Sequence, residues 1–238
     1  MRYETIIIGA GAAGMMCAAH VRDALVIDHA KAAGEKIRIS GGGRCNFTNI
    51  YASAENFLSE NTHFAKSALA RYTQWDFIDL VQRYDIPYHE KTLGQLFCDT
   101  SAKDIIAMLR DLMHAAGAEL WLKTSVTSVR HDNGTFTLDI MKGDLAETLT
   151  CKNLVLATGG KSIPKMGATG FAYDIATQFG MRVTETRPAL VPLTFSDGRF
   201  AEISGVSLPV RAQAGAGVFD EAMLFTHRGL SGPAILQI

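Results

Sequence analysis

The stretch that decides the fold runs from Tyr3 to Asp28 and reads YETIIIGAGAAGMMCAAHVRDALVID. Its first six residues, Tyr3 to Ile8, form an apolar run rich in β-branched side chains, which predicts a buried parallel strand. The segment from Met15 to Arg22 is rich in alanine and methionine and predicts a helix. Ala24 to Asp28 predicts a second buried strand. Together these segments predict a βαβ unit with an unusually short connection.

A GxGxxG motif, with glycines at Gly9, Gly11 and Gly14, joins the first strand to the helix. The first glycine permits a tight turn, the second lets the backbone approach a pyrophosphate, and the third lets the helix pack close to the strand. The free amides and the dipole of the helix N-terminus favour a phosphate at this point. Asp28 ends the next strand, where its carboxylate would accept a hydrogen bond from a ribose hydroxyl. This context predicts a dinucleotide-binding site rather than an unliganded turn.

A second glycine cluster lies within the region Lys31 to Asn49, which is too rich in glycine and polar residues to predict regular structure. It reads SGGGRCN from Ser40 to Asn46 and offers successive backbone amides, a guanidinium group and amide side chains. FAD and NAD share the GxGxxG fingerprint, but a plain NAD domain has no need of a second cluster. The cluster therefore predicts contacts to a ligand segment beyond the adenosine half.

The middle of the chain predicts two capped helices and a group of antiparallel strands. Helices are predicted from Thr73 to Tyr84 and from Ser101 to a stop at Gly117, each with a capping box. From Glu119 to Cys151 the apolar period changes to two, with a tight turn at Asn133-Gly134, which predicts a small β-meander. A buried strand from Asn153 to Ala157 and a helix from Gly170 to Phe179 are expected to follow.

After Pro188 the pattern becomes mostly β. Strands are predicted at Leu190 to Phe195, Val206 to Ala212 and Val218 to Phe225. We therefore expect an α/β fold: a Rossmann-like FAD-binding domain over residues 1–194, with a parallel sheet, helices and a β-meander, then the start of a mostly β insert domain over residues 195–238.

Composition excludes several classes of protein. The chain has 238 residues, 47% of them apolar and 20% charged, which is typical of a globular domain. It carries 23 basic and 24 acidic side chains, and this balance leads us to expect neither a nucleic-acid nor a membrane partner. The four cysteines form no zinc-binding spacing, so no metal site is expected and a cytoplasmic location is favoured.

Four segments together resemble the HI0933-like flavoproteins, a branch of FAD-dependent oxidoreductases that includes aminoacetone-oxidase-like proteins. They are IIIGAGAAG at Ile6 to Gly14, SGGGRCNFTN at Ser40 to Asn49, LVLATGG at Leu154 to Gly160 and LFTHRGLSGPAILQ at Leu224 to Gln237. The second and fourth segments are highly specific, and the resemblance covers the whole chain.

The resemblance implies a noncovalently bound FAD. It implies that Val126 reaches the adenine through its backbone and that the chain passes the cofactor again after Leu154 to Ala157. Together with the two glycine motifs, it gives these expected cofactor-binding residues: Gly9, Gly11, Ala12, Ala13, Gly14, Asp28, Lys36, Gly42, Gly43, Arg44, Cys45, Asn46, Asn49, Val126, Thr158, Gly159 and Gly160.

Two features depart from the family pattern. Members of the family are longer, and their last third returns to the FAD domain, so we expect the end at Ile238 to be a truncation. It falls inside a helix that Ser231 is expected to cap and Pro233 to open. The short crossover after Gly14 is expected to weaken the pyrophosphate-binding helix.

The other side chains that could take part in chemistry are expected to have structural roles. Cys45 has no resolving cysteine nearby in sequence and is expected to be an inert thiol. His227 is more typical of a structural loop histidine than of an acid or base. The aromatic residues Tyr72, Trp75 and Phe77 surround a helix start and are expected in the core. No catalytic residue is predicted.

We expect the protein to be an FAD-dependent oxidoreductase that moves a hydride between a small-molecule substrate, or NAD(P)H, and FAD. No second GxGxxG motif follows a strand downstream, so NAD(P)H would bind transiently as a reductant. Two alternatives stay open. One is a truncated FAD- or dinucleotide-binding protein without turnover, and the other is an RNA-modifying flavoprotein, which the charge balance disfavours. The oligomeric state is not predicted.

Overall fold

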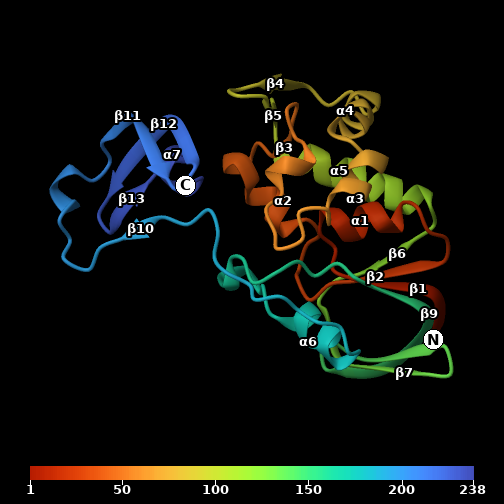
Figure 1. The fold of residues 1–238 in the computed structure, drawn as a ribbon. Coiled ribbons are helices and arrows are strands. Elements are labelled where there is room, and N and C mark those ends of the chain that lie inside the picture. Colours follow the sequence, from red (N-terminus) through yellow and green to blue (C-terminus); the bar gives the residue numbers. More distant parts are fainter. The chain divides into compact units, whose positions relative to one another are not determined.

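The computed structural model describes residues 1–238, except for the side chain of Lys165. The chain forms two compact units, Met1–Met181 and Arg182–Ile238 (Figure 1). The first unit combines a mixed sheet with helices, and the second is mostly β. The predicted α/β fold class, with a Rossmann-like domain followed by mostly β structure, is confirmed.

The first unit is built on a six-stranded sheet with strand order β6-β2-β1-β9-β8-β7. Its strands are β1 (Arg2–Ile8), β2 (Ala24–Ile27), β6 (Glu119–Trp121), β7 (Thr124–Asp132), β8 (Thr135–Lys142) and β9 (Leu145–Leu156). The pairs β6·β2, β2·β1 and β1·β9 are parallel, whereas β9·β8 and β8·β7 are antiparallel. The predicted βαβ unit and β-meander are therefore confirmed as parts of one sheet.

Two details of this sheet differ from the prediction. The last strand of the meander and the strand expected from Asn153 form one continuous strand, β9, of 12 residues. Its residues from Leu145 to Cys151 pair with β8, and those from Thr150 to Leu156 pair with β1. The apolar period that placed Leu120 in the meander belongs instead to β6, which pairs with β2 at the sheet edge. Period-two patterning reports a strand but carries no information on its partner.

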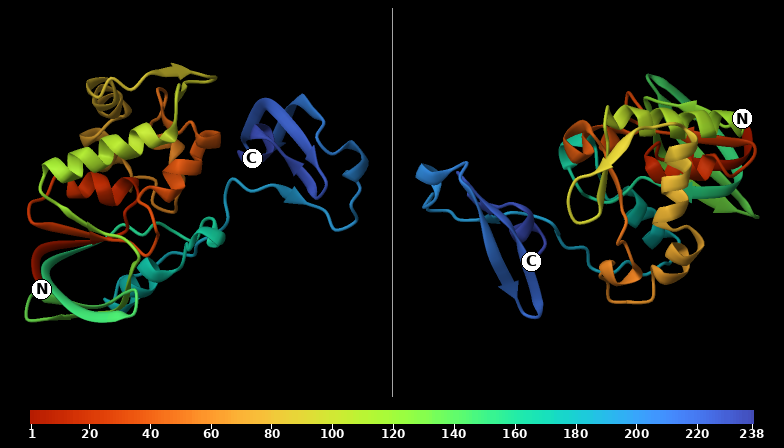
Figure 2. Two further views of the ribbon diagram at one scale, coloured as in Figure 1. Left: turned by 180° about the vertical axis from the view of Figure 1, so that it is seen from behind. Right: turned by 90° about the horizontal axis from the view of Figure 1, so that it is seen from above.

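Successive side chains of β1 point to opposite faces of the sheet. Ile7 packs with α1 (Ala12–Ala18) and α5 (Ala102–Ala115) in one buried cluster. Ile6 and Ile8 point to the other face and pack with apolar residues of the meander and of α6 (Phe171–Gln178). Figure 2 shows α1 and α5 on one side of the sheet and the curved meander on the other. This sandwich fixes the end of β1, where the GxGxxG turn begins.

The helices largely follow their sequence signals. In α4 (Gln74–Arg83) the side chain of Thr73 caps the first turn in a capping box with Asp76, and Ser101 does the same for α5 with Asp104, as predicted. The helix expected from Met15 to Arg22 begins earlier and ends at Ala18. A helix of 7 residues is short enough for the tight crossover.

The region from Lys31 to Asn49, which we expected to lack regular structure, contains α2 (Glu35–Ile39), a 3-10 turn η1 (Ser40–Gly43) and the strand β3 (Asn46–Asn49). β3 joins β5 (Gln95–Cys98) and β4 (Tyr88–Glu90) in a small antiparallel sheet of order β3-β5-β4. Between β3 and α4 lie η2 (Ala54–Asn56) and α3 (Lys66–Arg71). The three successive glycines of this region weaken any periodic signal, so the sequence alone predicts a loop.

The aromatic residues near the start of α4 divide between core and surface. Phe77 packs against Phe47, with ring centroids 6.0 Å apart, and joins the core as expected. Trp75 and Tyr72 are 55% and 41% exposed, so the expectation that they are core residues was wrong. In a helix, only the residues on the inward stripe are buried, and Trp75 lies off that stripe.

The second unit is a four-stranded antiparallel sheet of order β10-β13-β12-β11. The strands are β10 (Leu193–Thr194), β11 (Ser207–Ala214), β12 (Gly217–Thr226) and β13 (Gly229–Ser231), accompanied by η4 (Ala201–Ile203) and α7 (Pro233–Leu236). Pro233 opens α7 as predicted, but Gly232, not Ser231, occupies the N-cap. The domain division at Thr194 stays a prediction, and β10 belongs to the sheet of this second unit.

Candidate functional site

The turn between β1 and α1 has the backbone geometry that a nucleotide-binding loop needs. Gly9 has φ +113°, and a Cβ there would lie 2.4 Å from the carbonyl oxygen of Ala157. A Cβ on Gly14 would lie 1.8 Å from the carbonyl oxygen of Gly9. At Gly11, by contrast, a Cβ would meet nothing within 4 Å. Packing therefore requires glycine at Gly9 and Gly14, whereas Gly11 leaves open the space beside the first turn of α1.

Asp28 closes this turn from the end of β2. Its Oδ2 accepts a hydrogen bond from the Ala10 amide at 2.6 Å, and its Oδ1 accepts one from the Ala30 amide at 2.8 Å. The side chain is 15% exposed, so it is accessible from the groove. Each carboxylate oxygen has a second lone pair, which leaves acceptor capacity for a sugar hydroxyl.

Two adjoining cavities form a groove along the carboxyl edge of the parallel strands. The larger, about 400 Å³, reaches from Ile8 to Val126 and Phe171, and the smaller, about 270 Å³, reaches from Gly9 to Lys36. They are continuous because they share lining residues: Gly9, Asp28, His29, Thr158 and Gly167. In open α/β sheets, ligands bind outside the carboxyl ends of the strands. The groove is therefore the candidate functional site.

The structure brings about half of the expected cofactor-binding residues to this groove. Lys36 lies at its far end, and its Nζ donates a hydrogen bond to Ser162 Oγ at 3.0 Å. Gly14 lies directly behind the wall, in contact with Gly9. The expected residues that line the groove are Gly9, Gly11, Ala12, Ala13, Asp28, Lys36, Val126, Thr158 and Gly159.

The other expected residues do not line the groove: Gly42, Gly43, Arg44, Cys45, Asn46, Asn49 and Gly160. Asn49 is used locally, since its Oδ1 accepts from the Tyr51 amide and its Nδ2 donates to the Leu93 carbonyl. Cys45 is buried in the core, and burial raises the pKa of its thiol, which favours the inert state expected from the sequence. Their assignment to the cofactor stays a prediction.

The second glycine cluster forms a left-handed turn. Gly41, Gly42 and Gly43 have φ of 55°, 66° and 87°, and the Cys45 amide closes the turn on the Ser40 carbonyl at 3.0 Å. A Cβ on Gly41 would lie 2.7 Å from the Phe97 ring, whereas one on Gly42 would meet nothing within 4 Å. Successive amides in such a turn make a concave surface that suits an anion or a polar ring edge.

Several groove residues escaped the sequence reasoning. His29 lines both cavities, and Gly167 packs so closely that a Cβ there would lie 2.3 Å from His29 Nε2. Thr124 and Ser125 at the start of β7 line the larger cavity. The glycines of the MGATG segment around Gly167 were the signal that could have pointed to this wall, because they follow a predicted strand.

Metal-binding clusters and membrane-spanning helices are absent from the part of the chain that the structure describes. Within the described part of the chain, no three His, Cys, Asp or Glu side chains cluster in a way that could hold a metal ion. None of the described helices is both long and apolar enough to cross a bilayer. His227 lies in the turn between β12 and β13.

Two known proteins that carry the same name are similar to this chain over almost its whole length. Ribosomal RNA dihydrouridine synthase of Escherichia coli (strain K12) is 52% identical over 246 residues, which cover 100% of this chain and 60% of that protein. The protein of the same name from Haemophilus influenzae (strain ATCC 51907 / DSM 11121 / KW20 / Rd) is 48% identical, covering 99% of this chain and 60% of its own length. The chain thus spans about 60% of the length of both relatives.

A solved structure shares the fold. The crystal structure of 3-ketosteroid-Δ4-(5α)-dehydrogenase from Rhodococcus jostii RHA1 has a TM-score of 0.51 and 14% identity, and the match covers 67% of this chain and 46% of that chain.

The names of the two relatives overturn our expectation that nucleic acid is not a partner. That expectation rested on a formal net charge of -1. Net charge sums over the whole surface, whereas an enzyme can read one base by stacking and hydrogen bonds within a small site. Charge balance therefore did not justify the exclusion.

The sequence profile described as "HI0933-like protein Rossmann domain" matches residues 3–231, nearly the full chain. The match spans the GxGxxG turn, the second glycine cluster and the segment after β9. The chain therefore belongs to the HI0933-like family.

Proposed function

We propose that this chain binds FAD in the groove and serves a flavin-dependent reduction of uracil in ribosomal RNA. The RNA part of the proposal is supported by one observation above all: 52% identity, over the whole chain, to a relative named ribosomal RNA dihydrouridine synthase. At this level of identity the residues of a substrate site can be shared. This proposal replaces the small-molecule substrate that we expected from the sequence.

The groove fits an adenine dinucleotide in its shape and in its donor set. The open space at Gly11 would accept the pyrophosphate, and the first turn of α1 has no side-chain cap that would compete for its amides. The Asp28 carboxylate stands where a ribose hydroxyl would donate to it. The larger cavity, lined by Val126 and Phe171, suits the adenine ring.

The remaining predicted residues would contact the flavin half of the cofactor. Lys36 and Gly159 line the smaller cavity, which Val126 does not line, and Thr158 lines both cavities. The left-handed turn at Gly41, Gly42 and Gly43 would present amides to the flavin ring system. When bound, FAD would supply hydride transfer, with NAD(P)H as transient donor and the double bond of uracil as acceptor. The protein would bind and orient the cofactor and the uracil, and it would exclude water from them.

Two measurements test this proposal in sequence. The protein is purified, and any small molecule released by denaturation is identified, which should be FAD. The loaded protein is then incubated with NADPH and ribosomal RNA that lacks dihydrouridine. Formation of dihydrouridine, seen as a mass gain of two hydrogens on one nucleoside, is the expected result.

Controls separate the two parts of the proposal. Release of FAD without RNA reduction would retain the cofactor but reject the RNA substrate, and reduction of a small unsaturated carbonyl compound would then favour the substrate first expected from the sequence. A purified protein that binds ADP but not FAD would reject the cofactor assignment. Omitting NADPH should abolish the reaction.

A further inference from the structure

A histidine–aspartate pair lies beside the second glycine cluster and outside every motif described above. His89 belongs to β4, and its Nδ1 lies 2.6 Å from Oδ1 of Asp99, which follows β5. The two side chains are 51% and 44% exposed. Within the described part of the chain, Nε2 of His89 has no hydrogen-bond partner. The imidazole is thus held at one nitrogen and presented to solvent at the other.

Two separate routes tie this pair to the glycine cluster. The first runs through Phe97, whose ring stacks on the His89 ring, with centroids 6.4 Å apart and an angle of 20° between the ring planes. The same Phe97 ring packs against Gly41. The second runs through Arg44, whose guanidinium donates to the backbone oxygen of Asp99. The arrangement of β3, β5 and β4 next to α2 can be followed in Figure 1. These contacts place His89 and Asp99 beside the second glycine cluster.

Register explains why these groups meet. His89 is paired with Phe97 across β4 and β5, and Asn46 is paired with Phe97 across β3 and β5. Residues in direct register point to the same face of a sheet. That face carries Gly41 against the Phe97 ring, whereas Cys98, the next residue of β5, is buried in the core on the opposite face. The small sheet therefore holds the glycine cluster and the histidine on one surface.

Charged groups of both signs lie near the His89 imidazole. The charged groups that the described structure places around His89 are the Asp99 carboxylate, the Arg44 guanidinium and the Lys91 ammonium, which lies 5.2 Å from the centroid of the Phe97 ring. A carboxylate on Nδ1 fixes the orientation of the ring. Such a ring can donate a proton from Nε2.

We propose that His89 donates the proton in the reduction of the uracil double bond, and that Asp99 is its positioning residue. This inference rests on the proposed function. Reduction of a double bond conjugated to a carbonyl adds a hydride at C6 and a proton at C5. When bound, the reduced flavin would supply the hydride with its electron pair, His89 Nε2 would supply the proton, and solvent would return a proton to the imidazole. Uracil gains two hydrogens in all, so atoms and electrons balance.

The main test separates the two half-reactions in the variant His89→Asn. Flavin reduction by NADPH should be unchanged, whereas reoxidation of the reduced flavin by ribosomal RNA should slow on the order of 100-fold or more. Added imidazole should restore part of the rate. The matched control is His114→Asn, because His114 is an exposed histidine on α5 that no part of this proposal uses.

A second measurement reads the pair without any cofactor. A hydrogen-bonded Nδ1–H of His89 should give a downfield proton NMR signal that disappears in both His89→Asn and Asp99→Asn. In the loaded enzyme, the rate of the RNA-dependent step should depend less on pH in His89→Asn than in wild type. A purely structural ion pair would change stability without changing the pH profile.

The outcomes are distinguishable from failure of the proposed function. If the wild-type protein reduces uridine and His89→Asn does so at the same rate, the proton-donor assignment is overturned while the function stands. If His89→Asn slows flavin reduction by NADPH as much as the RNA-dependent step, the assignment is also overturned. If wild-type protein reduces no uridine at all, both proposals fall.

Discussion

At the scale of single residues, the three glycines of the motif have different roles, and substitutions should distinguish the effect on FAD binding from the effect on stability. Gly11→Val adds a side chain to open space, so it should weaken FAD binding at least tenfold, about 1.4 kcal/mol, by filling the space of the pyrophosphate. The cofactor-free protein should lose only about 1 kcal/mol of unfolding free energy, because valine is a poorer N-cap than glycine. FAD titration and urea unfolding measure the two effects.

Gly14→Val is the matched variant for this experiment. Its Cβ would overlap the carbonyl oxygen of Gly9, which is backbone and cannot rotate away. The unfolding free energy of the cofactor-free protein should therefore fall by about 3 kcal/mol or more. Equal FAD affinity in Gly11→Val and wild type would contradict the placement of the pyrophosphate.

Asp28 supports both the turn and the expected ribose contact. Asp28→Asn keeps the shape but turns an amide donor toward one of the two backbone amides, which should cost about 1–3 kcal/mol. Because FMN lacks the adenosine ribose, FAD affinity should fall more than FMN affinity. Parallel titrations with the two flavins measure the ratio, and an unchanged ratio would place the adenosine elsewhere.

Residue chemistry was predictable where the sequence encodes local backbone geometry. The GxGxxG turn and Asp28 were recoverable because their spacing and their flanking strands restrict the backbone. The position of Arg44 was not recoverable in the same way. Its guanidinium contacts the backbone of Asp99, 55 residues later in the chain, and no local rule reports such a pairing. His29 was missed because a histidine after a strand carries no signature.

At the scale of elements, one ion-pair network joins the three strands of the meander. Arg130 on β7 contacts both carboxylate oxygens of Asp139 on β8, at 2.6 and 3.1 Å, and Thr148 on β9 donates to the same carboxylate at 2.9 Å. The Arg130 guanidinium, followed by the Ser128 and Thr148 hydroxyls, holds the pKa of the Asp139 carboxyl well below its usual range. The network pins the register of β7, β8 and β9.

This lowered pKa gives the pH dependence a definite sign. The Asp139 carboxyl is a stronger acid in the folded chain than in the unfolded chain, so its contribution is complete above about pH 4 and is lost as pH falls further. Asp139→Asn should therefore be less stable than wild type at neutral pH, and the gap should close in acid. Urea unfolding at several pH values measures this, with Asp144→Asn in the next turn as control.

Elements with a strong periodic signal were predicted with nearly correct ends. The capping boxes at Thr73 and Ser101 identify α4 and α5 because a cap is a local interaction. The partner of each strand was less accessible. The join of meander and parallel strand in β9 depends on contacts with β1, which lies almost 150 residues earlier in the chain. α2 was missed because five residues give too few turns for a period.

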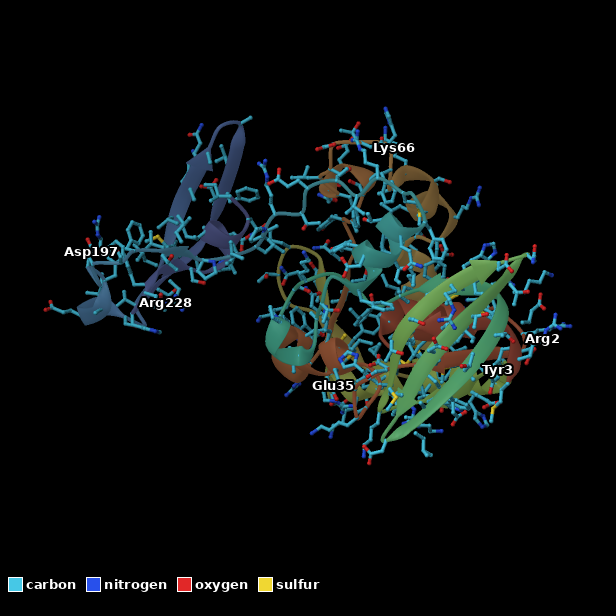
Figure 3. All side chains as sticks on the ribbon, turned by 90° about the horizontal axis from the view of Figure 1, so that it is seen from below. Arg2, Tyr3, Glu35, Lys66, Asp197 and Arg228 are labelled. Carbon is cyan, nitrogen blue, oxygen red and sulfur yellow. The ribbon has the colours of Figure 1, made fainter. Side chains whose placement is uncertain are left out.

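At the scale of the whole molecule, every residue that lines the groove belongs to the first compact unit. Figure 3 shows Glu35 and Arg2 in this unit and Asp197 and Arg228 in the other. The segment before β10 carries Arg187, whose side chain is 76% exposed. Brief trypsin treatment should cleave there, and visible flavin absorbance should remain with the N-terminal fragment on size exclusion. Loss of flavin on cleavage would show that the second unit contributes to FAD binding.

At this scale, the nucleic-acid partner is the property that the sequence analysis predicted wrongly. The balance of 23 basic and 24 acidic residues led away from RNA, although an RNA-modifying flavoprotein was among the alternatives. If few phosphates are contacted by this chain, RNA affinity should depend only weakly on salt, since each contact adds about 0.7–0.9 to the slope of log K against log salt. Filter binding at several salt concentrations measures the slope, and a steep value would indicate a basic surface that net charge conceals.

The parallel pairing of β1 with β9 also has a consequence for biosynthesis. Ile8, at the edge of the nucleotide turn, finds its sheet neighbour only at Leu156, and Gly9 packs on Ala157. A nascent polypeptide emerges from its N-terminus, so the first strand must wait, unpaired on this side, until the meander has left the ribosome exit tunnel. Such distant closure is entropically slow. During translation, the first strand to be made thus completes its pairing only after residue 156 has been made.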